Sequence, residues 1–382
     1  MTQGTGIEFQ AGDVLLRADY GDISAYHGGR YPAGTALGQK ALELARSLLF
    51  PGGGRFVRGK CSVETPFAGK GFEDALEMVL RCTSLGRYTF DLDMPVPPGT
   101  VPAPVRGKFF YRFFQEDGRA DLALKPGLVP EEFYKVSEDL YFKRVPPEAE
   151  EGAMELRRKI EAALLALDPT DIFDVREHKP CTVFPQDAPS EPPALKDDFR
   201  LRLKDYEEYQ VGIEQLRRYH GNASLCGLCL AWSLVRQWAR MEEGDEEGRE
   251  ALPREALPRR SVEVKSGALG DGISDAFEFL FRGTDGRVTV DTAWGDATPA
   301  PKVMPGSGAF AFRLALPGRP SRTFFLKEAV VPKDYLRLCR VKNENPGEFR
   351  EEKERKSLQL EFASRVLADP EPFEVVEIVE KA

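Results

Sequence analysis

The sequence predicts an α+β fold built from two tandem copies of one helix-strand-helix-three-strand unit around a mixed sheet. The first observation is a match between YHGGRYPAGTALGQKALELA, which starts at Tyr26, and YHGNASLCGLCLAWSLVRQWA, which starts at Tyr219. The second is a match between GKGFEDALEMVLR from Gly69 and GDGISDAFEFLFR from Gly270. Both pairs occur in the same order along the chain, which is what a duplicated domain produces.

The first long helix of each copy is expected directly after a His-Gly turn, at His27-Gly28 and at His220-Gly221. Apolar residues recur after each pair at the spacing of one helix face, which predicts an amphipathic helix. The apolar stripes are Leu37, Leu44 and Leu48 in copy one, and Leu230, Leu234 and Trp238 in copy two.

A strand comes next in each copy, because Val alternates with Ser and Glu in both SVET (62–65) and SVEV (261–264). The helices that start at Gly69 and Gly270 follow these strands. Three further strands then match in pairs: 87–91 with 287–291, 107–113 with 308–314, and 120–124 with 323–327. The closing elements match as well: helices at 153–167 and 348–367, each followed by a strand.

The domain boundary is marked by PQDAPSEPP, a Pro-rich stretch without apolar periodicity. The sequence therefore predicts a first unit over 1–184, a linker over 185–195 and a second unit over 196–382. We expect a helix over 197–218 and a solvated loop in the acidic insert 242–258. Two related domains on one chain commonly replace a homodimer, so we expect an internal pseudo-dimer, and the chain could pair further into a homodimer.

The composition narrows the classes of partner. The net charge of −9 argues against binding to a nucleic-acid backbone, which requires clustered Lys and Arg. No apolar run approaches the roughly 20 residues that span a bilayer, and no secretory signal opens the chain. The six cysteines do not have the spacing of a disulfide framework, so we expect a reducing, cytoplasmic compartment.

His27 and His220 are the sharpest candidates for function, because the chain has only three histidines and two of them occupy equivalent positions. A neutral imidazole at the start of a helix can ligate a metal or accept a proton. Gly28 and Gly221 would let a cofactor or ligand approach the backbone. The alternative is that each ring caps a helix for purely structural reasons.

Two further pairs of equivalent residues are candidates. Asp74 and Asp275 lie on the helix expected to face the histidines, where they could act as catalytic bases or orient the imidazoles. An Asp on a helix is also an ordinary surface feature. Arg112 and Arg313 occupy equivalent strands and could bind a cofactor, or they could form ion pairs with nearby acids instead.

A zinc ion requires three or four N, S or O ligands in tetrahedral array. Two candidate sets fall in the two copies: His27, Cys61 and Cys82 in the first, and His220, Cys226 and Cys229 in the second. The alternative is that these cysteines are small buried core residues, which is common for free cysteine.

The order of these segments resembles the E-subunit family of formylmethanofuran dehydrogenase (the FmdE-like proteins), whose signature is HGHxCPG at a helix start. His27-Gly28 and His220-Gly221 match the beginning of that signature, and Asp74-Ala75 and Asp275-Ala276 match a later helix. Further matches are Cys82-Thr83, Gly107-Lys108 and Ile172-Phe173. The resemblance covers most of the chain twice and implies an α+β unit, frequent dimerisation and zinc binding. The second His of the signature is replaced by Gly29 and Asn222.

Three functions follow as expectations. The resemblance implies a protein that binds a metal or small molecule at the His-Gly motifs, accessory to one-carbon or anaerobic metabolism. A second hypothesis is an enzyme that uses a His with a helix Asp as an acid-base pair. A third is a scaffold in which the pocket has decayed.

Overall fold

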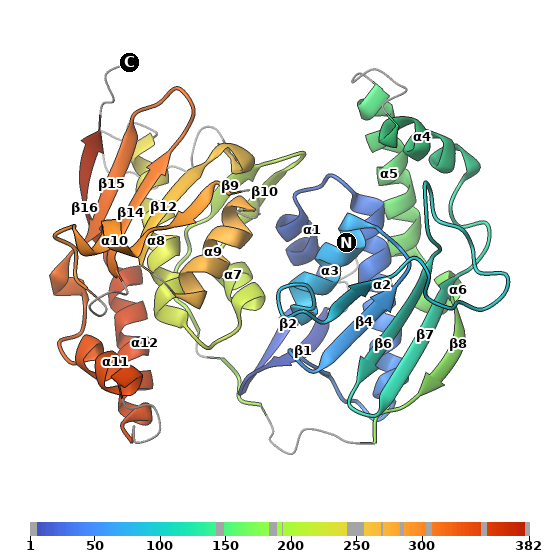
Figure 1. Ribbon diagram of the computed structural model, residues 1–382, viewed down its shortest axis with the longest axis horizontal. Helices are drawn as coiled ribbons and strands as arrows, with labels where there is room; N and C mark the ends of the chain where they lie inside the picture. Colours follow the sequence, from blue (N-terminus) through green and yellow to red (C-terminus); the bar gives the residue numbers. More distant parts are fainter. Residues whose placement is uncertain are drawn as a thin grey trace. The chain divides into compact units, whose positions relative to one another are not determined.

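The computed structural model describes residues 6–142, 149–182, 189–192, 194–242, 256–268, 270–282, 286–302, 308–344 and 350–378. The chain divides into two units, Met1–Pro192 (unit 1) and Pro193–Ala382 (unit 2), and each unit is described by itself (Figure 1). The division falls within the segment expected as a linker, of which residues 185–188 and 193 lie outside the described residues. Ser190, in the described part, pairs with Val14, so that part packs on unit 1.

Unit 1 alternates helices and strands as the periodicity predicts. Its elements are β1 (Ile7–Ala11), β2 (Val14–Ala18), α1 (Tyr20–His27), α2 (Pro32–Leu49), β3 (Phe56–Val57), β4 (Cys61–Thr65), α3 (Lys70–Leu80), β5 (Tyr88–Phe90), β6 (Phe110–Gln115), β7 (Gly118–Leu124), α4 (Glu131–Tyr141), α5 (Ala149–Ala166), α6 (Pro169–Ile172) and β8 (Phe173–Lys179).

Unit 2 repeats this order with small additions. Its elements are β9 (Leu201–Lys204), β10 (Glu208–Val211), α7 (Ile213–His220), α8 (Leu225–Glu242), β11 (Leu257–Pro258), β12 (Glu263–Ala268), α9 (Asp271–Phe281), β13 (Val288–Val290), α10 (Thr292–Asp296), β14 (Gly308–Ala315), β15 (Ser321–Leu326), α11 (Tyr335–Glu344), α12 (Glu352–Ala368) and β16 (Phe373–Ile378). Short 3₁₀ turns occupy Arg259–Ser261 and Glu328–Val330.

The sheets of the two units have the same topology. The larger sheet runs β5-β4-β6-β7-β8 in unit 1 and β13-β12-β14-β15-β16 in unit 2. In each, the first pair of strands is parallel and the others are antiparallel, so the sheet is mixed. A smaller sheet runs β2-β1-β3 and β10-β9-β11. The predicted α+β class and the tandem repeat with a mixed sheet are therefore confirmed, whereas the pairing of the units as a pseudo-dimer stays a prediction.

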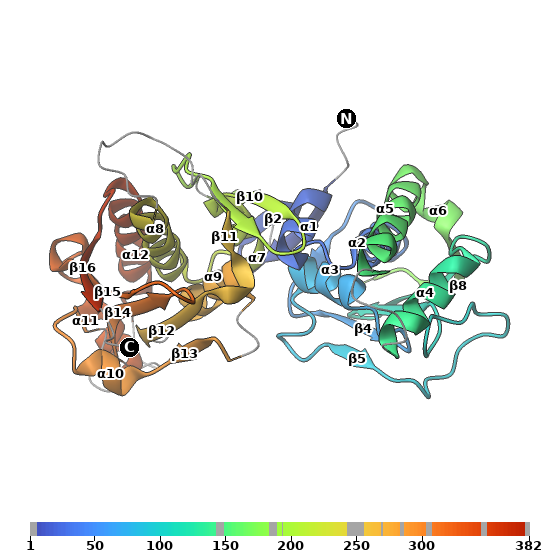
Figure 2. The same ribbon diagram turned by 90° about the horizontal axis from the view of Figure 1, so that it is seen from above.

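The long helices of each unit cover one face of its larger sheet (Figure 2). In unit 1, Tyr111 of β6 stacks on Phe72 of α3 with ring centroids 4.2 Å apart. At the equivalent position of unit 2, Phe312 of β14 packs edge-on against Phe277 of α9 at 6.1 Å. These four rings are all buried, so the core lies between the sheet and the helices.

Two expectations about secondary structure are wrong or incomplete. The helix expected over 197–218 is instead the hairpin β9-β10 followed by α7, which begins only at Ile213. Leu201 and Leu203 are buried while Lys204 is exposed, and this period of two is the pattern of a half-buried strand. The equivalent hairpin β1-β2 was not expected either. Of the insert expected as a loop over 242–258, residues 243–255 lie outside the described residues, and its last two residues form β11.

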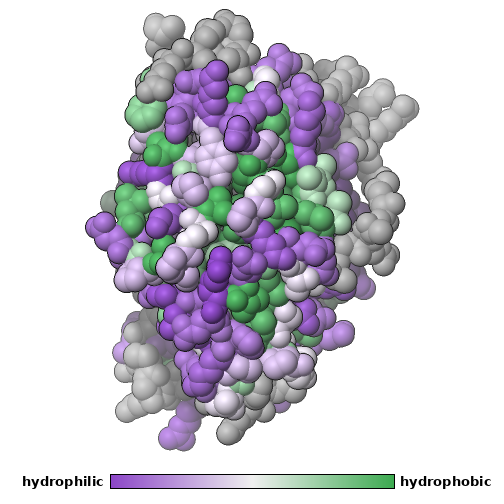
Figure 3. Space-filling model, turned by 90° about the vertical axis from the view of Figure 1, so that its right-hand side faces the viewer, coloured by the Kyte–Doolittle hydropathy of each residue, from purple (hydrophilic) through white to green (hydrophobic). Residues whose placement is uncertain are grey.

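The surface of unit 1 mixes polar and apolar residues. Figure 3 shows one face on which hydrophilic residues predominate and apolar residues gather toward the middle. Tyr141 and Phe142, at the end of α4, are both more than half exposed. Among the described residues, no helix is both long enough and apolar enough to cross a membrane.

Candidate functional site

His27 ends a helix rather than beginning one, which corrects the expectation from the sequence. It is the last residue of α1, and Gly28 caps that helix in the left-handed region at a φ of 83°. Gly28 donates its N–H to the carbonyl of Ser24, so the chain leaves the helix and reverses toward α2. Gly221 follows α7 with a φ of 94°. Both glycines thus adopt the positive φ with which the chain leaves the helix, and this conformation is sufficient to explain why glycine occupies both positions.

The His27 ring uses both of its nitrogens inside unit 1. The N–H of Tyr31 donates to Nε2 at 2.8 Å, which requires the proton of the neutral ring to lie on Nδ1. Nδ1 in turn donates to Oδ2 of Asp74 at 2.7 Å. Because both side chains are only 3 % exposed, the ring ties the end of α1 to the start of α2 and to α3.

Unit 2 repeats this arrangement with its own residues. The Nδ1 of His220 lies 2.7 Å from Oδ2 of Asp275, and the N–H of Ser224 donates to Nε2 at 3.1 Å. The sequence predicted that each Asp faces its His, and the structure brings both pairs together. The backbone partners of Nε2 could not be predicted, because a main-chain donor leaves no trace in the sequence.

The two pairs differ in their surroundings. Lys70 lies 3.1 Å from Oδ1 of Asp74, which therefore has a cationic neighbour in addition to the imidazole. The matched stretches place Asp271 at the position of Lys70, so unit 2 has an acid there instead. The Asp275 side chain is 16 % exposed, compared with 3 % for Asp74. The carboxylate of the pair in unit 2 is therefore more accessible than that of the pair in unit 1.

Small residues let the helices approach closely enough for each pair to form. A Cβ added at Gly34 of α2 would lie 3.2 Å from the Cα of Gly71 in α3. A Cβ added at Gly227 of α8 would lie 3.4 Å from the Cα of Gly272 in α9. The second helix of each unit thus packs almost backbone to backbone on the third, which carries the Asp.

Arg112 and Arg313 lie on the other face of the sheets. Side chains alternate along a strand, so Arg112 points away from the face on which Tyr111 meets α3. Its Nε donates to Asp121 at 3.1 Å, and its Nη1 lies 3.5 Å from Glu64. Arg313 lies 5.6 Å from the Trp294 ring. Both arginines belong to networks on the sheet surface and do not join the histidines, so their expected cofactor role stays a prediction.

Cys61 and Cys82 lie at the far end of α3 from His27. Both thiols are fully buried, and the Cys82 thiol donates to the carbonyl of Cys61 at 3.8 Å. Burial raises the pKa of both thiols above the usual value. Asp74 is six residues before Leu80, where α3 ends, about 9 Å along the helix at 1.5 Å per residue, and Cys82 follows beyond the left-handed cap at Arg81. The structure does not bring this set of three together.

Cys226 and Cys229 are buried in α8, and burial raises the pKa of both thiols. Cys226 contacts Tyr335 rather than His220, whose ring nitrogens are already engaged. Within the described residues, no group of three or more His, Cys, Asp or Glu side chains could hold a metal ion. The residues expected as zinc ligands thus do not fit a tetrahedral site in either unit.

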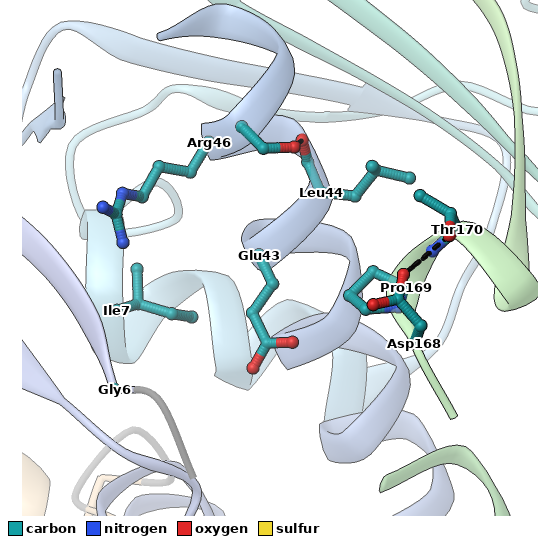
Figure 4. Close-up of a pocket in the computed structure, with 9 residues that line it drawn as sticks. Gly6, Ile7, Glu43, Leu44, Arg46, Asp168, Pro169 and Thr170 are labelled. Atoms are coloured by element: carbon teal, nitrogen blue, oxygen red, sulfur yellow. Dashed lines mark hydrogen bonds between the residues drawn. The ribbon is translucent and has the colours of Figure 1, made fainter. Parts of the chain in front are cut away.

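A pocket of about 290 Å³ opens in unit 1 at the other end of α2 (Figure 4). Glu43 points into it from α2, with Arg46 at one edge and Asp168 at the opposite edge. Gly6, which precedes β1, and Ile7, its first residue, line the pocket on the same side as Arg46. Sequence reasoning missed this pocket, because its walls come from segments far apart along the chain.

Unit 2 fills the equivalent place with its own chain. The matched stretches place Arg236 at the position of Glu43 and Trp232 at that of Gln39. Oδ2 of Asp197 accepts from Nη1 of Arg236 and from Nε1 of Trp232, both at 2.8 Å. The charged side chains of this pair are only 5 % and 6 % exposed. In the sequence, the difference between Glu43 and Arg236, and between Gln39 and Trp232, indicates that the two copies differ at this place.

Comparison with known proteins adds no assignment. No family model matches the chain, and no curated protein matches it.

Proposed function

We propose that the protein binds a small zwitterionic molecule in the pocket of unit 1, and that the two His-Asp pairs hold the fold together. The observation that carries this proposal is the contrast at the second helix of each unit. In unit 2 an internal carboxylate, Asp197, is bound to Arg236, whereas the described residues of unit 1 leave a pocket lined by Glu43 at that place. Residues 1–5, which precede Gly6 at the wall of this pocket, lie outside the described residues. Among the residues that the structure describes, unit 2 fills this place with its own carboxylate and unit 1 does not, so the place in unit 1 is suited to take a ligand.

The charges on the pocket wall set the class of ligand. Glu43 is turned into the pocket with a side chain that is 17 % exposed, and it replaces the cationic Arg236 of unit 2 with an anion. Hydrogen bonds from Thr170 lower the pKa of Asp168, so this carboxylate is ionised at neutral pH. Lys40 lies 3.6 Å from Oε2 of Glu43, and Gln39 donates to its Oε1, so the charge of Glu43 is partly balanced within α2. Asp168, together with the remaining charge of Glu43, favours an ammonium group on the ligand.

Arg46 supplies the opposite charge. Its guanidinium forms no hydrogen bond or ion pair with any residue in the part of the chain that the structure describes, and it lies at the edge of the pocket. A guanidinium is the preferred partner of a carboxylate, which it binds through two parallel hydrogen bonds. A molecule with an ammonium and a carboxylate a few bonds apart, as in an amino acid, matches these walls.

The test is a thermal-shift screen of the full chain with three panels: amino acids, primary amines and simple carboxylates. We expect the melting temperature to rise with members of the first panel only. Glu43→Gln and Arg46→Gln should each abolish that rise. Glu155→Gln is the control, because Glu155 lies on α5 outside the pocket with a side chain that is 69 % exposed. No shift with any amino acid, or a shift that survives both pocket variants, would overturn the proposal.

The metal and acid-base hypotheses receive less support from the geometry. Each imidazole has both nitrogens engaged within its own unit, so neither nitrogen is available as a ligand or base without breaking a hydrogen bond. We keep kinship with the FmdE-like proteins as a proposal. It is supported by the His-Asp pairs, which form in both units from residues that the resemblance singles out. We also keep a cytoplasmic location as a proposal, supported by six free cysteines.

A further inference from the structure

A second pocket, of about 690 Å³, opens in unit 2 beside its smaller sheet. Its walls come from β9, β10, β11 and the turn between β14 and β15, and Ser261 of the 3₁₀ turn also lines it. None of the residues that line it belongs to the His220-Asp275 pair. The pocket is therefore a separate feature of unit 2.

The smaller sheet turns a polar face toward this pocket. Arg202 and Lys204 are two residues apart on β9, so their side chains lie on the same face of that strand. The leucines that alternate with them are buried on the other face. Lys204 pairs in register with Glu208 of β10 on one side and with Pro258 of β11 on the other, and both of these also line the pocket. Lys204 thus lies in the middle of one wall.

The charge of Lys204 is not balanced within this wall. Nε and Nη2 of Arg202 both contact Oε1 of Glu208, at 2.7 Å and 2.6 Å, so this carboxylate is engaged by the arginine. Lys204 is exposed, and it forms no hydrogen bond or ion pair with any residue that the structure describes. One positive charge therefore remains on this wall.

A second positive charge remains at the turn between β14 and β15. Arg319 lines the pocket from this turn and lies 2.7 Å from Oε2 of Glu242. Glu242 also pairs with Arg322 through its other oxygen, so two guanidinium groups share one carboxylate. Within the described part of unit 2, the cations at the pocket thus exceed their carboxylate partners by two, one at Lys204 and one at this turn.

The two units differ in charge at this place. Lys204 pairs with the second residue of β11 as Gln10 pairs with the second residue of β3, so Gln10 is its equivalent in unit 1. The turn that carries Arg319 in unit 2 corresponds to the turn between β6 and β7, which carries Glu116 and Asp117. A cation in unit 2 thus faces a neutral amide in unit 1 in one case and two acids in the other. The cationic character of these walls is specific to unit 2.

We propose that this pocket binds a small phosphorylated molecule through its phosphate group. A phosphate monoester carries a charge of about −1.5 to −2 at pH 7, which matches the two positive charges that remain. The guanidinium of Arg319 can bind two phosphate oxygens at once, and Lys204 adds a point charge. Leu316 and Pro258 give the walls an apolar part for the organic portion of the ligand. The net charge of −9 disfavours a nucleic-acid backbone as the source of the phosphate.

The test titrates the purified full chain with pyrophosphate and with glucose 6-phosphate in a calorimeter at constant ionic strength. We expect saturable binding of both phosphates, no binding of glucose and weaker binding of succinate. Residues 243–255, which join Glu242 to Ala256 at the pocket wall, lie outside the described residues and contain six acids and two arginines. The full chain includes this acidic stretch, so the titration also measures whether it competes. Absence of binding by both phosphates, or succinate binding as tight as theirs, would overturn the proposal.

Variants locate the bound phosphate. Lys204→Gln and Arg319→Gln should each weaken the binding of glucose 6-phosphate by at least about tenfold, because each removes a charged donor. Lys333→Gln is the control, since it removes the same charge from an exposed lysine of unit 2 outside the pocket. Circular dichroism confirms that each variant is folded. Unchanged affinity in Lys204→Gln, or an equal loss in Lys333→Gln, would contradict the assignment. Loss of binding in Arg46→Gln instead would place the phosphate in the pocket of unit 1.

Discussion

His27 and Asp74 join three helices of unit 1 through one buried contact, with Nδ1 and Oδ2 2.7 Å apart. The same contact recurs between His220 and Asp275. Because each ring also accepts from a backbone N–H, the imidazole is a structural link of fixed tautomer. Loss of either imidazole should therefore remove a link between helices and lower the stability of its unit.

His27→Ala should lower the free energy of unfolding by about 2–3 kcal/mol, because the buried Asp74 would lose its imidazole partner while it keeps its contact with Lys70. His220→Ala is the matched variant. Its cost should be smaller, about 1–2 kcal/mol, since Asp275 is more exposed and water can reach it. Chemical denaturation, followed by a probe in each unit, measures both values. Equal stability of the two variants and the wild type would show that the rings do not link the helices.

The Tyr111 hydroxyl is buried and has no hydrogen-bond partner among the described residues. A buried hydroxyl without a partner costs about 1–3 kcal/mol. Tyr111→Phe should therefore raise the free energy of unfolding by about 1 kcal/mol, because the ring keeps its stacking on Phe72. Phe312→Tyr in unit 2 is the reciprocal change and should be destabilising. A loss of stability in Tyr111→Phe would mean that the hydroxyl has a partner, such as a bound water.

Periodicity was sufficient to predict the repeat, the larger sheets and the helices that pack on them. It failed at β9-β10, because four-residue strands give too short a pattern to distinguish from a helix face. The His-Asp pairing could be predicted, since the equivalent residues recur in both copies. The position of His27 at a helix end could not be predicted, because it depends on the left-handed turn at Gly28. Asp197 was beyond prediction, since its partners lie more than thirty residues away.

Glu352 should give stability that depends on pH. Arg355 and Lys342 hold it by hydrogen bonds, and the pKa of this carboxyl is lowered to about 2 from a usual value of 4.5. A folded-state pKa below the unfolded value stabilises the fold above about pH 4.5. That stability is lost as the pH falls toward 2. The side chain is 39 % exposed, so screening limits the effect to about 0.5 kcal/mol.

Denaturation of Glu352→Gln at pH 7 and at pH 3 checks this effect. The variant should be less stable than the wild type at pH 7, and the difference should narrow at pH 3. Glu361→Gln, which removes an exposed i,i+4 pair with Arg365, is the control on the same helix. A constant difference at both pH values would show that the charge of Glu352 does not contribute.

Gly71 of α3 lies against the backbone of Tyr31 and Thr35, next to the His27-Asp74 contact. A Cβ at this position would collide with the carbonyl oxygen of Tyr31 and lie 2.9 Å from the N of Thr35. Since Tyr31 also donates to His27, Gly71→Ala should displace α3 from α2 and weaken the pair. We expect a loss of about 2 kcal/mol in the free energy of unfolding.

Gly52→Ala is the control for this substitution, because a Cβ there meets no atom within 4 Å. The double variant of His27→Ala and Gly71→Ala distinguishes a shared effect from two separate ones. If close packing acts partly through the His-Asp pair, the double variant should lose about 1 kcal/mol less than the two single losses together. Full additivity would mean that the helices need small residues for packing alone, and that the pair forms independently of them.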